Sequence, residues 1–267
     1  MIDIGIVTRT APALSRDTLT GVFNRTCPAY SRETAHKINL GKQMGYADRP
    51  APPPEPRQQP RMAWNEPPRP AAKPLPPALR LPELQRPVAR GQKTPLDMPQ
   101  GASARLRVAF GWNVKDARCD IDASAFLLGP NDRVISDDWF VFYGQPESPD
   151  GSVRFQQDGR TEREIITVDF GRLDPRVQRI VFVMTIDEAI ENRLNLGMVS
   201  EAWLRVLDES GRERVSFRPM ELYENITSMT LGEIYLRGGQ WRFNPVGNGV
   251  KADLAGQCAV YGVNISD

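Results

Sequence analysis

Apolar and polar residues alternate with a period of two in several short segments of the second half of the chain. Leu106, Val108, Phe110 and Trp112 alternate with polar or small neighbours, which is the pattern of a strand with one buried face. Further short apolar or β-branched runs follow at residues 126–128, 139–143, 165–168, 180–186, 203–207 and 259–265. We expect a strand at each of these runs.

Turn-forming residues separate the apolar runs. Gly238-Gly239 lies between the runs 234–237 and 240–243 and predicts a hairpin with a two-residue turn. Short strands separated by such turns favour an all-β fold, a two-sheet β-sandwich, over the βα alternation that a parallel sheet needs. Short helices are expected at residues 174–179 and 187–194, and the sandwich domain is expected to span residues 88–267.

The residues before this domain have a different composition. Of the 24 prolines, 16 lie between Pro50 and Pro99, where they remove backbone donors and favour extended geometry. We expect residues 47–87 to be a Pro-rich, disordered linker. A plain spacer is the favoured interpretation, while Pro74-Leu75-Pro76-Pro77 with Arg80 keeps open a role as ligand for an aromatic groove.

The N-terminal segment, residues 1–46, has no assigned role. Its pattern predicts a short strand at residues 1–7 and weak helices at residues 16–25 and 31–46.

Charge is distributed unevenly although the net charge is only +1. Residues 1–99 carry a net charge of +7 and residues 100–267 carry −6. The basic half is too weakly charged for the dense basic surface that binds nucleic acid, so no nucleic-acid partner is expected. The acidic half favours cations.

The rare residue types exclude several classes of protein. The only histidine, His36, lies outside the expected sandwich, and no nucleophile–base pair stands out, so we predict no enzymatic activity. Metal-assisted hydrolysis at an acidic pocket remains a formal alternative.

The cysteines Cys27, Cys119 and Cys258 are an odd, scattered set that is typical of reduced thiols in a cytoplasm. No apolar stretch is long enough for a transmembrane helix, and no signal peptide is expected.

Five acidic residues are candidate metal ligands. Asp120 and Asp122 lie on one face if they belong to a strand, about 7 Å apart. Asp150 lies in an Asp-Gly turn, and Asp158 and Glu164 bound a short loop. Together these side chains offer the carboxylate oxygens that Ca²⁺ prefers. Taken one motif at a time, a solvated strand start and ordinary turns explain them better.

Several motifs in order resemble one known family. They are Phe110-Gly111-Trp112-Asn113, Asp120-Ile121-Asp122-Ala123-Ser124-Ala125-Phe126, Phe140-Val141-Phe142-Tyr143, Ser148-Pro149-Asp150-Gly151-Ser152, residues 197–208, residues 232–237 and residues 241–249. Over about residues 88–265, this set resembles the tellurium-resistance TerD stress-protein family.

The resemblance implies a β-sandwich that binds calcium between acidic loops and acts in tellurite resistance and stress tolerance. It also implies assembly with other stress-resistance proteins at the inner membrane. The family's metal loops fall on Asp120, Asp122, Asp150 and residues 158–164. The last loop is shorter than usual and contains two arginines, Arg160 and Arg163, so we expect calcium affinity to be weakened or one of two sites to be lost.

Two hypotheses follow from the sequence. The first is a calcium-binding, non-enzymatic stress-response module that acts through assembly with partner proteins, in the cytoplasm and associated with the membrane through those partners. The alternative is a metal-free β-sandwich scaffold that recruits partners through its Pro-rich segment.

Overall fold

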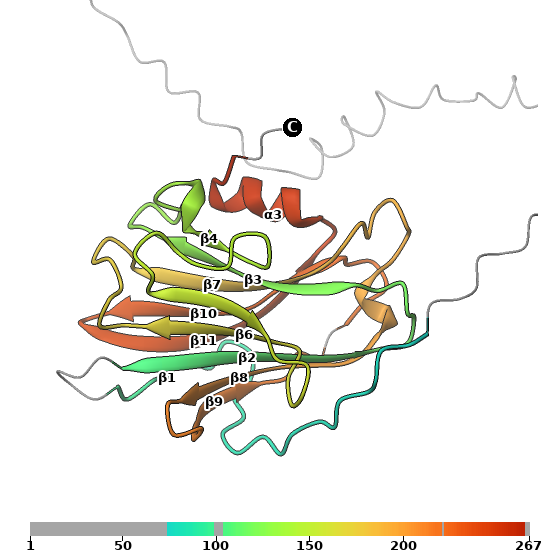
Figure 1. The fold of residues 1–267 in the computed structure, drawn as a ribbon, viewed down its shortest axis with the longest axis horizontal. Helices are drawn as coiled ribbons and strands as arrows, with labels where there is room; N and C mark the ends of the chain where they lie inside the picture. The colour runs from blue at the N-terminus through green and yellow to red at the C-terminus, as the bar shows by residue number, and fades with distance from the viewer. Residues whose placement is uncertain (1–73, 99–103, 221, 265–267) are drawn as a thin grey trace, which may run out of the picture. The chain divides into compact units, whose positions relative to one another are not determined.

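Figure 1 shows the computed structural model of the chain, which describes residues 74–98, 104–220 and 222–264. The elements expected within residues 1–46, and residues 47–73 of the expected linker, lie outside the described residues. The described strands are β1 (Thr94–Pro95), β2 (Arg105–Val114), β3 (Ile121–Leu128), β4 (Phe140–Val141), β5 (Val153–Gln157), β6 (Glu164–Asp169), β7 (Arg179–Ile186), β8 (Val199–Asp208), β9 (Glu213–Phe217), β10 (Ser228–Arg237) and β11 (Gln240–Val250). The helical elements described are the 3-10 turns η1 (Asp137–Trp139) and η2 (Leu196–Met198) and the α-helix α3 (Leu254–Tyr261).

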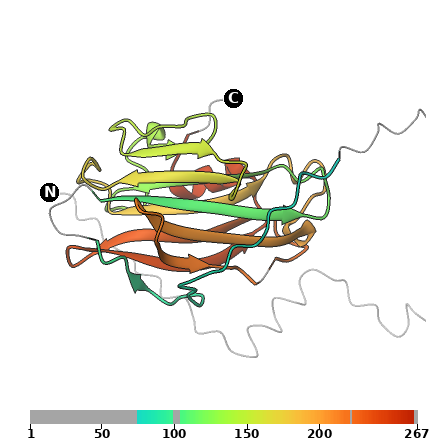
Figure 2. The same cartoon turned by 60° about the horizontal axis from the view of Figure 1, so that its bottom comes forward.

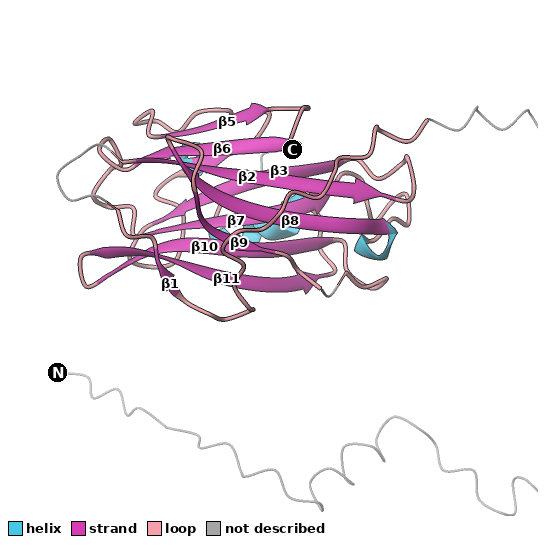
Figure 3. Cartoon of the chain, turned by 90° about the horizontal axis from the view of Figure 1, so that it is seen from below, coloured by secondary structure: helices cyan, strands magenta, loops and turns pink. Residues whose placement is uncertain are grey.

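These strands form two antiparallel sheets. Sheet A has five strands in the order β5-β6-β2-β8-β9, and sheet B has six in the order β1-β11-β10-β7-β3-β4. Figure 3 shows the two sheets as stacked layers. The predicted all-β, two-sheet architecture is confirmed.

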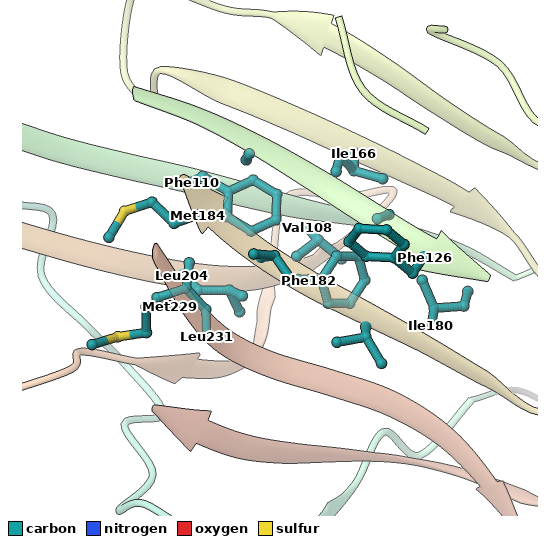
Figure 4. Close-up of a cluster of buried hydrophobic side chains, with 14 of the residues drawn as sticks. Val108, Phe110, Phe126, Ile166, Ile180, Phe182, Met184, Leu204, Met229 and Leu231 are labelled. Carbon is teal, nitrogen blue, oxygen red and sulfur yellow. The ribbon is translucent and has the colours of Figure 1, made fainter. Parts of the chain in front are cut away.

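The core lies between the sheets and is built by alternate residues of the strands. Val108, Phe110 and Leu204 of sheet A meet Phe182 and Ile180 of sheet B, and all five are fully buried (Figure 4). The rings of Phe110 and Phe182 lie 5.9 Å apart, centroid to centroid. Burial of these alternating apolar side chains is the main driving force for pairing the sheets.

The other face of sheet A, which we call the outer face, carries the residues between these core positions. Trp203 lies on it and is fully buried. Its indole lies across Gly111 of the neighbouring strand, where an added Cβ would come within 2.0 Å of the ring. Only glycine at position 111 leaves room for the indole in this position.

The hairpin expected around Gly238-Gly239 is confirmed. Arg237 of β10 pairs with Gln240 of β11, and the two glycines have φ values of 58° and 74°. Positive φ at both central residues is the geometry of the hairpin turn that glycine permits without strain.

Three expectations about local structure were wrong, and a fourth was confirmed only in part. The run at residues 259–265 is not a strand, because α3 covers its first part, with the Asp253 side chain accepting a hydrogen bond from Gly256 N and Gly262 in the left-handed region at its end. Residues 187–193 form turns, and residues 174–179 contain no helix. The aromatic run at 139–143 supplies only the two-residue strand β4.

We call residues 77–88 the strap. They comprise the end of the expected linker and the first residue of the expected sandwich, and they lie along sheet A. Leu79 is hydrogen-bonded to Asn113 of β2, and Arg86 and Val88 are hydrogen-bonded to β9. Figure 2 shows this segment running along the sandwich. The hydrogen-bonded structure therefore begins before residue 88.

Candidate functional site

Acidic side chains gather at one rim of the sandwich, where β3 begins and β7 ends. Asp122 pairs with Thr185 across these strands, and the N–H of Asp187 donates to the carbonyl of Asp120 at 2.8 Å. Glu164 starts β6 in the other sheet and reaches this rim, where its Oε2 accepts from the N–H of Ala123 at 2.6 Å. The rim therefore joins carboxylates from both sheets.

Burial and mutual repulsion raise the pKa of two of these carboxyls. Burial, helped by the charges of Asp120 and Asp187, raises the pKa of Asp122 to about 6. Burial also raises the pKa of Glu164 to about 8, aided by the charges of Asp122 and Asp120 and opposed by the Ala123 hydrogen bond. A nearby cation would reverse both effects, because it stabilises the ionised carboxylates.

A cavity of about 320 Å³ opens beside this cluster. It lies between the end of β7, the start of α3 and the loop after β4, and is lined by Asp122, Tyr143, Thr185, Ile186, Asp187, Glu188, Glu191, Asp253, Leu254 and Ala255. Asp187 and Tyr143 were missed by the sequence reasoning. The acidic turn directly after the β-branched run 180–186 was the signal that could have revealed Asp187.

Asp150 lies away from this rim. Its loop precedes β5 and lies beside the end of β6, where Asp169 N donates a hydrogen bond to Ser152 O. Glu164 lies at the other end of β6. The six residues of β6 span about 17 Å between the two ends. The Asp150 carboxylate accepts hydrogen bonds from Ser148 Oγ, from the N–H and hydroxyl of Ser152, and from Asp174 N, at 2.7 to 2.9 Å. Its contacts are those of a residue that orders a loop.

Asp158 is also engaged in its own turn. Its Oδ2 accepts from the N–H and hydroxyl of Thr161 and from the N–H of Glu162, at 3.0 to 3.1 Å. Arg163 of the same loop donates to the carbonyls of Trp112 and Pro77, at 3.1 and 2.7 Å. The guanidinium of Arg163 is thus held on the strap side of the loop.

The structure therefore brings together three of the five predicted ligands, Asp120, Asp122 and Glu164, and leaves Asp150 and Asp158 apart. The carboxylate oxygens of Asp120, Asp122 and Glu164 are the kind of ligand that a hard cation such as Ca²⁺ prefers. The raised pKa of Asp122 and Glu164 agrees with such a cation. Among the described residues, however, no three His, Cys, Asp or Glu side chains are close enough together to hold a metal ion. The donor chemistry fits calcium, while the spacing gives no ready-made coordination shell.

The fold and this rim define a β-sandwich protein with an acidic cavity between sheet B and its terminal helix. Comparison with known families gives the same architecture a name: the TerD domain family matches residues 85–261, and the chain belongs to that family.

Individual relatives carry names of resistance and stress proteins. "Tellurium resistance protein TerD" of Serratia marcescens is 33% identical over 188 residues, covering 67% of this chain and 98% of the relative. "General stress protein 16U" of Bacillus subtilis (strain 168) is 29% identical over 188 residues, covering 67% and 97%. A solved homologue of telluride resistance protein from Streptomyces coelicolor A3(2) covers 62% of this chain and 100% of its own, with 18% identity and a TM-score of 0.46.

Two further observations concern membrane-spanning helices and free thiols. No helix among the described residues is long and apolar enough to cross a membrane. Cys119 and Cys258 are buried free thiols, and Cys27 lies outside the described residues.

Proposed function

We propose that this protein is a calcium-binding, non-enzymatic module of the stress and tellurite response, and that it acts by assembling with partner proteins. The observation that carries the calcium part is the pair of buried carboxyls, Asp122 and Glu164, whose pKa is raised at a rim rich in negative charge. The names of the relatives support the stress role.

The physical argument concerns the cost of these carboxylates in the folded state. The ionised carboxylates of Asp122 and Glu164 are destabilised by burial and by their acidic neighbours. A divalent cation held by Asp120, Asp122, Glu164 and Asp187 would offset that repulsion and stabilise the folded protein. Because these residues lack a preformed coordination shell, we expect weaker binding than in a site whose ligands are already in place.

Thermal unfolding with and without calcium tests this proposal. Calcium at one hundred times its Kd stabilises a folded protein by about 2.7 kcal/mol, which corresponds to a rise in Tm of roughly 5–10 °C for a domain of this size. We expect the full chain to show such a rise in millimolar CaCl₂ relative to EGTA, and a smaller one in MgCl₂.

Two variants and one matched control locate the site. Asp122→Asn and Glu164→Gln should abolish the calcium-dependent rise in Tm. Asp158→Asn should keep it, because its carboxylate is bound to its own turn. A wild-type Tm that is the same in calcium and EGTA would refute the calcium proposal.

The second candidate is a metal-free scaffold. It is favoured by the absence, among the described residues, of three metal-ligating side chains close together. It predicts no change in Tm with calcium, together with partner binding that requires residues 47–87.

Partner proteins of the stress response, association with the inner membrane through them, and a cytoplasmic location are part of the proposal. The free thiols of Cys119 and Cys258 support a reducing compartment.

A further inference from the structure

The main chain of the strap makes hydrogen bonds to the sandwich at both ends, and Val88 also packs against the core. Asn113 binds both main-chain groups of Leu79: Oδ1 accepts from Leu79 N at 2.8 Å, and Nδ2 donates to Leu79 O at 2.9 Å. Arg163 donates to the carbonyl of Pro77 at 2.7 Å. Bonds of this kind recognise an extended peptide whatever its side chains.

The other end of the strap is bound in the same way. The N–H of Arg86 donates to Glu213 Oε1 at 2.7 Å, while its carbonyl accepts from Ser216 N at 2.9 Å. The N–H of Val88 donates to Ser216 O at 2.9 Å. Pro87 and Ser216 form an isolated parallel bridge, so the strap pairs at this point with β9, the edge strand of sheet A.

Charged groups lie buried on the face beside the strap. Arg205 pairs with Glu162 at 2.8 Å and with Glu213 at 3.1 Å, and Glu162 also accepts from the indole N–H of Trp203 at 2.7 Å. Glu162 and Glu213 are 3% and 2% exposed, although they do not belong to the core between the sheets. Since Glu213 also binds Arg86, this polar network and the strap share a residue.

The strap itself is loosely packed. None of residues 74–87 is buried, and a cavity of about 520 Å³ separates residues 80–83 from Arg160, Thr161 and Arg205. A segment with few buried residues opens locally at low cost. The family match begins at residue 85, so the contacts of Pro77 and Leu79 lie in a part of the chain that precedes it.

We propose that the outer face of sheet A is a binding site for an extended peptide, that the chain's own strap occupies it, and that release of the strap opens it to a proline-containing segment of a partner. Asn113, Arg163 and Glu213 are the residues that read the main chain of the occupant. The strap then controls access to this face. This inference requires neither calcium nor the stress role.

Hydrogen exchange on the full wild-type chain tests whether the strap opens separately from the sandwich. We expect the amides of Arg86 and Val88 to exchange at least about a hundredfold faster than those of β2 and β8. Equal rates would mean that the strap leaves only when the whole sandwich unfolds, and would overturn the proposal.

A labelled peptide with the sequence of residues 74–88 tests the site directly. Leu79→Pro removes the N–H that Asn113 binds and weakens the strap while leaving the face unchanged. Leu75→Pro is the matched control, because Leu75 is 54% exposed and precedes the strap. Binding is followed by fluorescence anisotropy with full-length chains, and circular dichroism checks that each variant is folded.

We expect the peptide to bind the Leu79→Pro chain at least about tenfold more tightly than the wild type or Leu75→Pro. Adding Asn113→Ala to Leu79→Pro should remove most of that gain. Equal binding to the wild type and Leu79→Pro, or no binding to any folded variant, would overturn the proposal. If Leu79→Pro does not fold, the exchange rates of the wild type decide the question.

Discussion

Replacing Glu164 by glutamine isolates the energetic role of the acidic rim. Glutamine has nearly the same shape, and its side-chain carbonyl can still accept the hydrogen bond from Ala123 N. The substitution therefore removes the titrating carboxyl and leaves the local contact in place. Any change in the pH dependence of stability then reports on the charge at this position.

The sign and size of the effect follow from the raised pKa. The pKa of Glu164 is about 8 in the folded protein, against 4.5 for an ordinary glutamate, the value taken for the unfolded chain. The folded protein therefore holds this proton more tightly. The stabilising effect of this proton is complete below pH 4.5 and is lost as the pH rises to about 8. The difference corresponds to at most roughly 5 kcal/mol, and relaxation around the buried charge would reduce it.

Urea unfolding in EDTA between pH 5 and pH 9 measures this effect. We expect the free energy of unfolding of the wild type to fall by about 3–5 kcal/mol relative to Glu164→Gln over this range. Glu209→Gln, an exposed residue of the turn after β8, is the control and should follow the wild type. Parallel curves for the wild type and Glu164→Gln would show that the carboxyl is not buried at a repulsive rim.

Three further variants test the packing and the loops. Gly111→Ala places a Cβ against the Trp203 ring and should destabilise the fold by about 1–3 kcal/mol or more in thermal unfolding, whereas Gly129→Ala, whose nearest contact would be 3.6 Å, should be tolerated. Asp150→Asn should lower stability by about 1–3 kcal/mol, because the Asp150 carboxylate accepts hydrogen bonds that order its loop. It should leave any calcium-dependent rise in Tm intact. Loss of that rise would show that Asp150 contributes to the calcium site. Asp253→Ala removes the N-cap of α3 and should cost about 1 kcal/mol in urea unfolding; an unchanged midpoint would contradict the capping role.

Strand positions were predictable from two different patterns. The alternation around Val108 and Phe110 places β2 correctly, because successive side chains in a strand point to opposite faces. The β-branched run at 180–186 places β7, a strand buried along nearly its whole length. The Gly238-Gly239 turn was predictable for a similar reason, since few residues other than glycine adopt positive φ at two adjacent positions.

Local patterns failed where a short apolar run fits more than one structure. The run at 259–265 is apolar enough for a strand, yet Asp253 and Gly262 bound a helix there. The strap was likewise predicted as linker, because its composition builds no core of its own. Hydrogen bonds to Asn113, Arg163 and Glu213 hold it on the sandwich, and those partners are distant in the sequence.

The sequence by itself determined the class of fold, the family and the acidic character of one half of the chain, because these properties depend on composition and on patterns within short segments. Only the tertiary structure decided which carboxylates meet. Glu164 joins Asp120 and Asp122 because β6 of one sheet starts beside β3 of the other, while Asp150 lies at the opposite end of β6. Such proximity depends on the pairing and stacking of distant strands, which spacing along the chain does not specify.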